Sequence, residues 1–524
     1  MTCDREWSMP DRPIRLGILL ETSASAPAWI AELIGRIRAS TFVDLAMIGQ
    51  VVSTGRPMRP PMMWRLFAQL DRWVHARDDD AFAPVPTDVV LSGIRRGGAP
   101  ELAGASASKM LDVVLDLTGS PVAHDVPTPE HGSWWVDGGS ADHPQAFWSL
   151  LRGEHSSAAR VRRLGPRGVE VIGRAYVLTD QQSVFRTTSA IQWKCGTLVM
   201  RALRQLHLER QLSGEAERAT AASARWPAWP VVAWVALRIV VAFVRREWLD
   251  FGRRTTWFLA LRTKNWRRLA EREGRGFVPI VPPTGHGYAD PFLFKDAEKT
   301  YVFFEDLVHA EGKAVISCAE VTASGLRSPR VVVRADHHLS YPFVFRSGDT
   351  VYMLPESTRV QRLDLYRAVE FPWTWELDRT LMRDTYLADA TLLEHEGLLW
   401  LFGTTLSHGG KDWEDLHAWH ARSLDGPWTP HPLNPVVSDV RSARPAGRIF
   451  LDDGALIRPG QDCSVSYGSA VTLNRIDLLT TTQYAESSVG RIGPEWYPGN
   501  TGTHTIDHTD QFEVIDARAP LTRS

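Results

Sequence analysis

The C-terminal half of the sequence contains a four-fold repeat. The segments "ADPFLFKDAEKTYVFFE", "SYPFVFRSGDTVYMLPE", "ADATLLEHEGLLWLFGT" and "AGRIFLDDGALIRPGQD" begin at Ala289, Ser340, Ala388 and Ala446. Each has a small residue, then Asp, Tyr or Gly, an apolar run, a turn rich in Asp, Gly or Glu, and a second apolar run. Strand pairs joined by short turns and repeated about every fifty residues are typical of a β-propeller with one hairpin-based blade per repeat.

A fifth blade is predicted from "GTHTIDHTDQFEVIDAR" near the C-terminus, with closure helped by "FVPIVPP". We therefore predict a five-bladed β-propeller over residues 277–524. Residues 12–210 alternate strand-like runs such as "IRLGILL" and "VDLAMIG" with amphipathic stretches such as "APAWIAELIGRIRAS". That alternation predicts an α/β domain.

Residues 211–276 are predicted to be a helical, tryptophan-rich linker centred on "WPAWPVVAWVALRIVVAFVRREW". Arg238 interrupts its apolar run, and an arginine at mid-bilayer costs about 2.5–3.5 kcal/mol, which argues against a full span. Two readings stay open, a packed inter-domain helix and a membrane-surface contact through residues 226–248. In the second reading, Trp226, Trp229 and Trp234 lie at headgroup depth, and Arg245 and Arg246 face anionic lipid.

Charge and cysteine content exclude several classes of protein. The net charge of −2 without a long basic stripe gives no reason to expect a nucleic-acid partner. The four cysteines form no CxxC pair, so neither a zinc site nor a disulfide framework is predicted. The polar start "MTCDREWSMPDRPIR" lacks the apolar core of a signal peptide. We expect a cytoplasmic location, peripheral at the inner face of the membrane if the surface-helix reading holds.

The repeat predicts which side chains meet at the propeller axis. The first strand of each blade lines the channel, so Asp290, Tyr341 and Asp389 are expected to converge at its mouth. The second strand runs back to the same end, which places Glu305 near Asp290. The equivalent predicted pairs are Tyr341 with Glu356, Asp389 with Thr404, and Gly447 with Asp462.

Asp290, Asp389 and Glu356 are the predicted catalytic residues. In sugar chemistry one acid protonates the leaving oxygen while another carboxylate activates water or attacks the anomeric carbon. An Asp before a Pro often only caps a turn, which is the competing explanation for Asp290. The recurrence of an aspartate at the same phase, Asp389, favours a site.

Polar residues at the blade ends are the predicted substrate-binding set: Glu305, His338, Tyr341, Arg444, Arg458, Gln461 and Asp462. Arg444 and Arg458 suit bidentate binding of a carboxylate, phosphate or sugar hydroxyls, and equally suit structural salt bridges. Trp373, Trp375 and Trp428 suit stacking on sugars, although packing between blades is the favoured interpretation.

The region from Gly285 to Arg518 resembles the five-bladed propellers of the furanosidase clan, the arabinanases and β-xylosidases, through "ADPF". The resemblance implies that Asp290 is a general base. The pKa-tuning aspartate of that clan is replaced by Tyr341, and its acid has no matching position. No cofactor is predicted, although a single metal ion in the propeller channel, held by His504 or His508, stays an alternative because related propellers hold one near the axis.

A further resemblance rests on "HLSYPFVF", "YMLPES", "LYRAVEFPWTW", "GPWTPHPLNPV" and "ARPAG". With these motifs the chain is similar to the N-terminal region of plant glucosamine inositolphosphorylceramide transferases and to its stand-alone bacterial relatives. The N-terminal half of those relatives is similar to formyltransferases, which implies a Rossmann-type formyltransferase-like fold here. Trp134 and Val136 stand where that family has its Asn and His, so the fold is expected to have lost formyl transfer.

Three functions follow as hypotheses. The first is a carbohydrate-active protein with glycosidase-like acid/base chemistry at the propeller mouth, acting on a cell-envelope glycan, a glycolipid or its precursor. The second is a non-catalytic scaffold that binds a glycan or lipid head group beside a glycosyltransferase. The third is a formyl or acyl transferase in the N-terminal domain.

Overall fold

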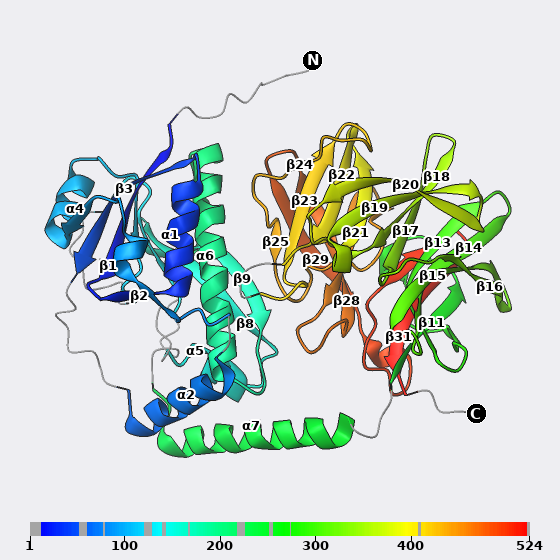
Figure 1. Ribbon diagram of the computed structural model, residues 1–524, viewed down its shortest axis with the longest axis horizontal. Coiled ribbons are helices and arrows are strands. Elements are labelled where there is room, and N and C mark those ends of the chain that lie inside the picture. Colours follow the sequence, from blue (N-terminus) through cyan, green and yellow to red (C-terminus); the bar gives the residue numbers. More distant parts are fainter. Residues whose placement is uncertain are drawn as a thin grey trace. The chain divides into compact units, whose positions relative to one another are not determined.

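The computed structural model describes residues 12–51, 60–76, 79–119, 128–138, 143–165, 168–216, 226–250, 255–272, 274–406 and 410–520. The chain divides into two compact units (Figure 1). The first comprises Met1–Arg246, and the second comprises Glu247–Ser407 and Lys411–Ser524.

The first unit is built on an eight-stranded mixed sheet with the order β10-β9-β8-β7-β6-β1-β3-β5. Its strands are β1 (Ile14–Glu21), β3 (Val43–Val51), β5 (Arg96–Gly98), β6 (Val113–Asp116), β7 (Ser133–Val136), β8 (Ser156–Gly165), β9 (Gly168–Leu178) and β10 (Glu215–Ala216). In the order of the sheet, β5, β3, β1, β6 and β7 pair in parallel with their neighbours, while β7, β8, β9 and β10 pair antiparallel. Two short strands, β2 (Ser25–Pro27) and β4 (Pro84–Pro86), pair separately.

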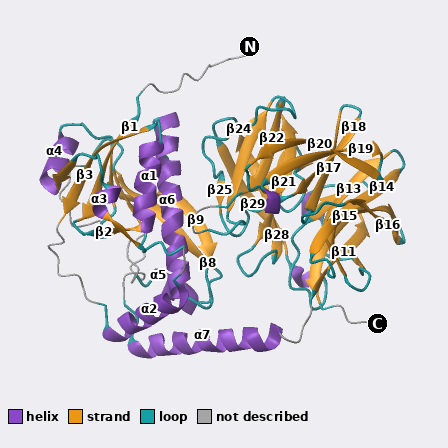
Figure 2. Cartoon of the chain, in the orientation of Figure 1, coloured by secondary structure: helices purple, strands orange, loops and turns teal. Residues whose placement is uncertain are grey.

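The same part of the chain also contains helices, which are purple in Figure 2. They are α1 (Ala28–Ala39), α2 (Met62–His75), α3 (Thr87–Val90), α4 (Ala99–Ala107), α5 (Gln145–Leu151), α6 (Val184–Glu209) and α7 (Trp229–Asp250). Ser183 begins α6 by accepting a hydrogen bond from the Arg186 backbone N–H, and Arg210 ends it in the left-handed conformation. The predicted α/β organisation is confirmed as a mixed sheet with helices. The formyltransferase-like identity of the unit stays a prediction.

The linker prediction is partly wrong. Helix α7 is present, and within the described ranges none of the helices combines the length and apolar character needed to span a bilayer. Thr256–Thr263, predicted as helical linker, is instead strand β11 and pairs antiparallel with β31 (Phe512–Ala519). The reason is long-range, because the strand that pairs with "TWFLALRT" lies about 250 residues further along the chain.

The second unit consists of five sheets, which confirms the five predicted blades. The first blade contains β13 (His286–Asp296), β14 (Lys299–Val308), β15 (Lys313–Thr322) and β16 (Gly325–Val333), and the second contains β17 (Ser340–Ser347), β18 (Thr350–Glu356), β19 (Arg362–Glu370) and β20 (Thr374–Arg383). The third blade contains β21 (Ala388–His395), β22 (Leu398–Thr404), β23 (Asp415–Ala421), β24 (Thr429–Pro430) and β25 (Val437–Ser438). The fourth contains β26 (Phe450–Asp452), β27 (Ala455–Asp462), β28 (Ala470–Leu479) and β29 (Tyr484–Ile492). The fifth contains β12 (Val278–Ile280), β11, β31 and β30 (Ile506–His508), so strands from both ends of the propeller sequence close the ring. Short 3₁₀ turns lie at Leu269–Glu271, Thr358–Val360 and Pro494–Trp496.

The second residue of each repeat has an unusual backbone conformation. Asp290, Tyr341 and Asp389 have φ angles of 50°, 45° and 54°, and Gly447 has 126°. In the first three blades the strand register shifts at this position. A bulge of this kind bends the strand and changes the direction of a side chain. The same local feature therefore sets the side-chain direction of Asp290, Tyr341 and Asp389 in three successive blades.

The predicted pairing of Gly447 with Asp462 is wrong. Pro445 bridges Gly460, and the Gln461 N–H donates to the carbonyl of Arg444 at 2.7 Å. The backbone passes so close to the closing blade that a Cβ on Gly447 would lie 1.9 Å from the Ile506 oxygen. That close approach shifts the register, and it places Arg444 beside Gln461.

The tryptophans that suited sugar stacking pack between blades. The Trp375 ring, on β20 of the second blade, meets the Phe303 ring of β14 edge-on at 5.6 Å. Trp373 contacts Tyr301 at 6.1 Å, and Trp428 packs against an apolar cluster formed by the second and third blades. The favoured structural role of these three residues is therefore confirmed.

Candidate functional site

Arg444 ties together carboxylates from two blades. Its Nε lies 2.6 Å from Asp389 Oδ2, and its Nη2 lies 3.4 Å from Glu356 Oε2. Its Nη1 lies 3.2 Å from Oδ2 of Asp412, in the loop before β23. The arginine side chain is only 6% exposed. The two predicted acids Asp389 and Glu356 thus meet at one buried cation, and Asp412 joins them although no sequence pattern predicted it.

The remaining oxygens of the two acids are also hydrogen-bonded. Gln461 Nε2 donates to Asp389 Oδ2 at 2.9 Å, while Arg444 Nη2 reaches Oδ1 at 3.3 Å. Glu356 Oε2 accepts the Asp389 backbone N–H at 3.0 Å, and Oε1 accepts the Thr358 hydroxyl at 3.0 Å. Burial raises the pKa of Asp389, and the Arg444 guanidinium opposes that shift. We call Asp290, Glu356, Asp389, Arg444 and Gln461 the axial cluster.

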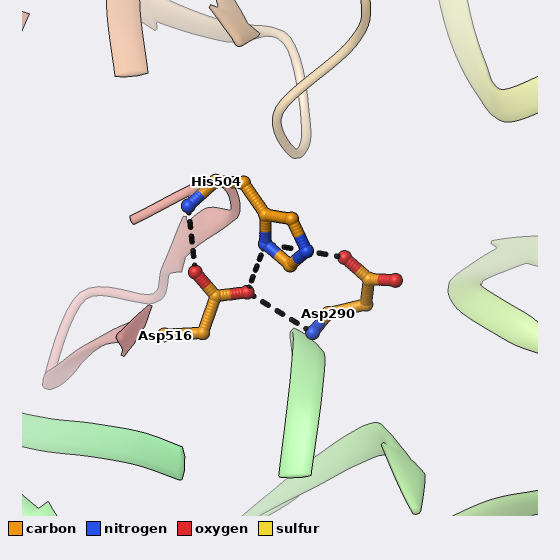
Figure 3. Close-up of side chains that lie close together, drawn as sticks. All are labelled: Asp290, His504 and Asp516. Carbon is orange, nitrogen blue, oxygen red and sulfur yellow. Dashed lines mark hydrogen bonds and ion pairs between the residues drawn. The ribbon is translucent and has the colours of Figure 1, made fainter. Parts of the chain in front are cut away.

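Asp290 lies beside a buried histidine of the closing blade. Figure 3 shows Asp290, His504 and Asp516 pointing toward one another, with His504 Nδ1 at 2.5 Å from Asp516 Oδ2 and 3.7 Å from Asp290 Oδ1. The Thr505 hydroxyl donates to Asp290 Oδ1 at 2.7 Å, and the Tyr341 N–H donates to Oδ2 at 3.3 Å. Asp290 is therefore joined to both the second and the fifth blade.

Burial and neighbouring charges set the protonation of this group. Burial raises the pKa of Asp290 to about 7, an effect that the His504 imidazole opposes and Glu305 reinforces. Burial lowers the pKa of His504, but the carboxylates of Asp516 and Asp290 outweigh it and raise the pKa overall. Burial and the acidic neighbours of Asp290 therefore favour the neutral form of its carboxyl group.

A metal ion would have to replace existing hydrogen bonds here. One ligand atom each from Asp290, His504 and Asp516 lies within 4.8 Å of the others. However, Asp516 Oδ1 already accepts the His504 and Thr505 N–H groups at 2.8 and 3.0 Å, and Oδ2 accepts the Asp290 N–H at 3.2 Å besides facing His504. With the lone pairs of Asp516 engaged in this way, the three residues fit an internal network better than a cation site.

His508 does not share this network. Its ring stacks on Trp266 at 4.9 Å and meets Phe450 edge-on at 4.7 Å. Burial lowers its pKa to about 4. His504 stacks instead on Trp257 at 4.0 Å. The two histidines named as alternative metal ligands therefore have separate surroundings.

Tyr341 fills the position of the absent aspartate with a structural hydroxyl. The side chain is fully buried, and its hydroxyl lies 2.8 Å from Thr391 Oγ1. The Gly447 N–H donates to the same hydroxyl at 2.8 Å. One side chain of the second blade therefore joins the third and fourth blades.

Glu305 and His338 form a partly exposed pair next to the axial cluster. His338 Nε2 lies 3.3 Å from Glu305 Oε1, and the side chains are 25% and 14% exposed. The Ala314 N–H donates to His338 Nδ1 at 3.2 Å, which directs the Nε2 proton toward Glu305. The predicted proximity of Glu305 to Asp290 agrees with the pairing of Ala289 with Glu305 and with the effect of Glu305 on the Asp290 pKa.

Two predicted binding residues serve the fourth blade itself. The Arg458 Nε and Nη2 donate to the Glu486 carboxylate at 2.8 and 2.7 Å, and this arginine is 1% exposed. Asp462 Oδ1 accepts the Ser464 N–H at 3.0 Å and its hydroxyl at 2.6 Å, which caps the turn after β27. The structure brings neither residue to the axial cluster.

The propeller is similar to one part of larger plant proteins. A family described as "Glucosamine inositolphosphorylceramide transferase 1, N-terminal" matches residues 283–495. The relative of that name from Oryza sativa subsp. japonica is 38% identical over 222 residues, which are 40% of this chain and 30% of the relative. The one from Arabidopsis thaliana is 38% identical over 206 residues, 38% of this chain and 27% of the relative. The similarity thus spans less than a third of these relatives.

Similar solved structures include glycoside hydrolases. An exo-β-1,3-galactanase from Phanerochaete chrysosporium has a TM-score of 0.32 and 16% identity, covering 40% of this chain and 51% of the galactanase. A family 117 glycoside hydrolase from Zobellia galactanivorans has a TM-score of 0.33 and 10% identity, covering 50% of this chain and 90% of the hydrolase.

Proposed function

We propose that the propeller recognises the carbohydrate part of a glycan or glycolipid head group at Glu305 and His338, the partly exposed pair next to the axial cluster, without cleaving it. The single observation that carries the non-catalytic assignment is the Arg444 contact with both Asp389 and Glu356. Support for a carbohydrate ligand comes from the plant relatives, whose name, glucosamine inositolphosphorylceramide transferase, includes an amino sugar.

Hydrolysis of a glycosidic bond needs a protonated acid and a second carboxylate free to activate water or attack the sugar. The carboxylate oxygens of Asp389 and Glu356 already accept hydrogen bonds from Arg444, Gln461, Thr358 and a backbone N–H. Recognition needs only polar atoms that reach solvent. Glu305 accepts hydrogen bonds and His338 donates one, which suits sugar hydroxyls.

Isothermal titration of the full chain with a glucosamine-bearing inositol phosphate tests this proposal. Wild type should bind saturably, and Glu305→Gln should weaken binding about tenfold, since a charge-assisted hydrogen bond is worth about 1.5–3 kcal/mol. Glu311→Gln is the matched control, because Glu311 pairs with the exposed Arg334 on the same blade. Mass spectrometry should recover the ligand intact. Absence of saturable binding, equal weakening by the control change, or release of free sugar each contradicts the proposal.

Acid–base catalysis at Asp290 is the second candidate, and one observation favours it. The Asp290 carboxyl has its pKa raised to about 7 by burial, the range in which a general base or acid works. If this candidate is correct, an assay for release of sugar from the same ligand will show turnover in wild type and none in Asp290→Asn.

For the N-terminal unit we propose a formyltransferase-like fold that has lost formyl transfer. Trp134 is fully buried and Val136 is 8% exposed, and neither side chain moves protons. The Asp137 carboxylate pairs with Arg160 at 3.1 Å and with Arg162. Incubation with a formyl-folate donor and an amino-sugar nucleotide should leave both unchanged, whereas a formylated product would contradict this reading.

A cytoplasmic location, peripheral at the inner face of the membrane, is also a proposal. The exposed apolar side chains of α7 support the membrane contact in this proposal. In fractionated cells the chain should then sediment with membranes and leave them in high salt.

A further inference from the structure

Helix α2 exposes an apolar stripe. Its members are between 43% and 81% exposed: Met62, Met63, Leu66, Leu70, Trp73 and Val74. Positions three and four apart lie on one face of a helix, so these side chains form a continuous strip. The other face holds Trp64, which is 1% exposed within the core of the unit. No feature of the sequence had drawn attention to this helix.

Helix α7 has a second stripe of the same kind. Its exposed apolar members are Trp229, Trp234, Leu237, Val240, Val241 and Val244. Val232 and Val235 point the other way, into the same core that contains Trp64. Trp226, expected at headgroup depth, instead packs against Trp64 at 6.1 Å between ring centres. The start of α7 therefore lies next to α2, as Figure 1 shows.

The exposed charge on the described part of these helices is positive. Arg65 is exposed, whereas Arg238 is partly buried and the partly buried Arg72 pairs with Asp80 at 2.9 Å. The one carboxylate, Asp71, is buried, accepts the Phe185 N–H at 2.7 Å and faces His75 at 2.9 Å. The side chains of Arg245, Arg246, Glu247 and Asp250 lie outside the described part. Exposed apolar strips that have an exposed arginine beside them, and no exposed carboxylate among the described side chains of the two helices, are complementary to a lipid surface with anionic head groups.

We infer that α2 and α7 together form a two-helix face that docks the N-terminal unit on a bilayer containing anionic lipid. Tryptophan favours the interface between head groups and acyl chains, and Trp73, Trp229 and Trp234 are exposed on the two stripes. The Arg238 guanidinium lies 4.9 Å from the Trp234 ring and donates to the Leu151 carbonyl, which orients the cation beside the apolar stripe. This inference specifies the proposed membrane contact and is independent of carbohydrate binding by the propeller.

Vesicle sedimentation with the full chain tests the inference. The vesicles are phosphatidylcholine with about one third phosphatidylglycerol, or phosphatidylcholine alone, and contain no glycolipid that the propeller could bind. We expect tighter binding to the anionic vesicles, weakened by salt. Leu70→Glu and Leu237→Glu should each lower the partition coefficient at least about tenfold, because each withdraws one leucine from the interface.

Val89→Glu is the matched control, since Val89 is 67% exposed on α3 of the same unit. It should bind vesicles as wild type does. Protection of the buried Cys195 thiol from alkylation verifies that each variant is folded. Lack of binding by wild type, or an equal loss in the control, overturns the inference. The inference is also overturned if the wild-type chain forms a dimer that does not bind vesicles and that Leu70→Glu dissociates. The two-helix face would then join two copies of the chain.

Discussion

Replacing Arg444 by methionine isolates the contribution of the buried cation. Methionine retains most of the apolar stem, so the change removes the guanidinium and leaves Asp389, Glu356 and Asp412 without their shared cation. Removing one partner of a buried ion pair destabilises proteins by about 3–5 kcal/mol, because the remaining charge is buried without compensation. We expect the propeller of Arg444→Met to lose about this much at pH 8.

The loss should shrink as the pH falls. Burial raises the pKa of Asp389 even with Arg444 present, and without the guanidinium that opposes it the pKa rises further. The folded variant then binds a proton that the unfolded chain, with an ordinary aspartate pKa near 4, has already released. The variant therefore gains stability as the pH falls through the folded pKa, until both states are protonated.

Urea unfolding followed by a brief pulse of N-ethylmaleimide reads the two units separately. Cys318 lies buried in the propeller and Cys195 in the N-terminal unit, so mass spectrometry of the labelled peptides reports each transition. Arg334→Met is the control, because the Arg334–Glu311 pair is exposed and such pairs contribute about 0–1 kcal/mol. A penalty below about 1 kcal/mol in Arg444→Met, a penalty independent of pH, or an equal shift at Cys195 would refute the argument.

Three further changes test the ring of contacts, each by the same labelling assay. As the pH rises from 4 to 8, Asp290→Asn should gain up to about 4 kcal/mol of stability relative to wild type, because the folded pKa of about 7 lies above the ordinary value of 3.8. A stability difference that does not change with pH would contradict the raised pKa of the buried carboxyl. Tyr341→Phe should cost about 1–3 kcal/mol, since the hydroxyl serves Thr391 and the Gly447 N–H; a neutral effect would mean that water replaces it. Gly447→Ala should cost more than about 3 kcal/mol, as its Cβ would meet the Ile506 oxygen at 1.9 Å; an unchanged Cys318 transition would show that the closing blade can move aside.

The phase of the repeat was enough to predict which residues lead the blades. Asp290, Tyr341 and Asp389 share a left-handed backbone and a bulge, so equal positions in the repeat have equal positions in space. The phase failed in the fourth segment, where Gly447 does not pair with Asp462 and Arg444 lies beside Gln461 instead. There the backbone must pass the closing blade, a constraint that a hairpin pattern does not contain.

Other members of the site left no pattern to read. Asp412 lies in a loop outside the repeat, and Asp516 belongs to a strand whose neighbour β11 was predicted as part of a helical linker. Their contacts with Arg444 and His504 depend on ring closure between distant segments. The sequence "GKDWED" and the acid in "FEVIDAR" were the available signals, and acidic residues in loops and strands are too common to single them out.

The sequence by itself determined the number of blades, the residues that begin them and the apolar strips of each strand, because these follow from local alternation and turn chemistry repeated along the chain. The tertiary structure alone decided whether Arg444 and Arg458 face a ligand or neutralise neighbouring acids, and which side of α2 and α7 stays in solvent. Pairing of buried charges and exposure of a helix face depend on distances between segments far apart in the chain. Those distances exist only once the ring has closed and the helices have packed.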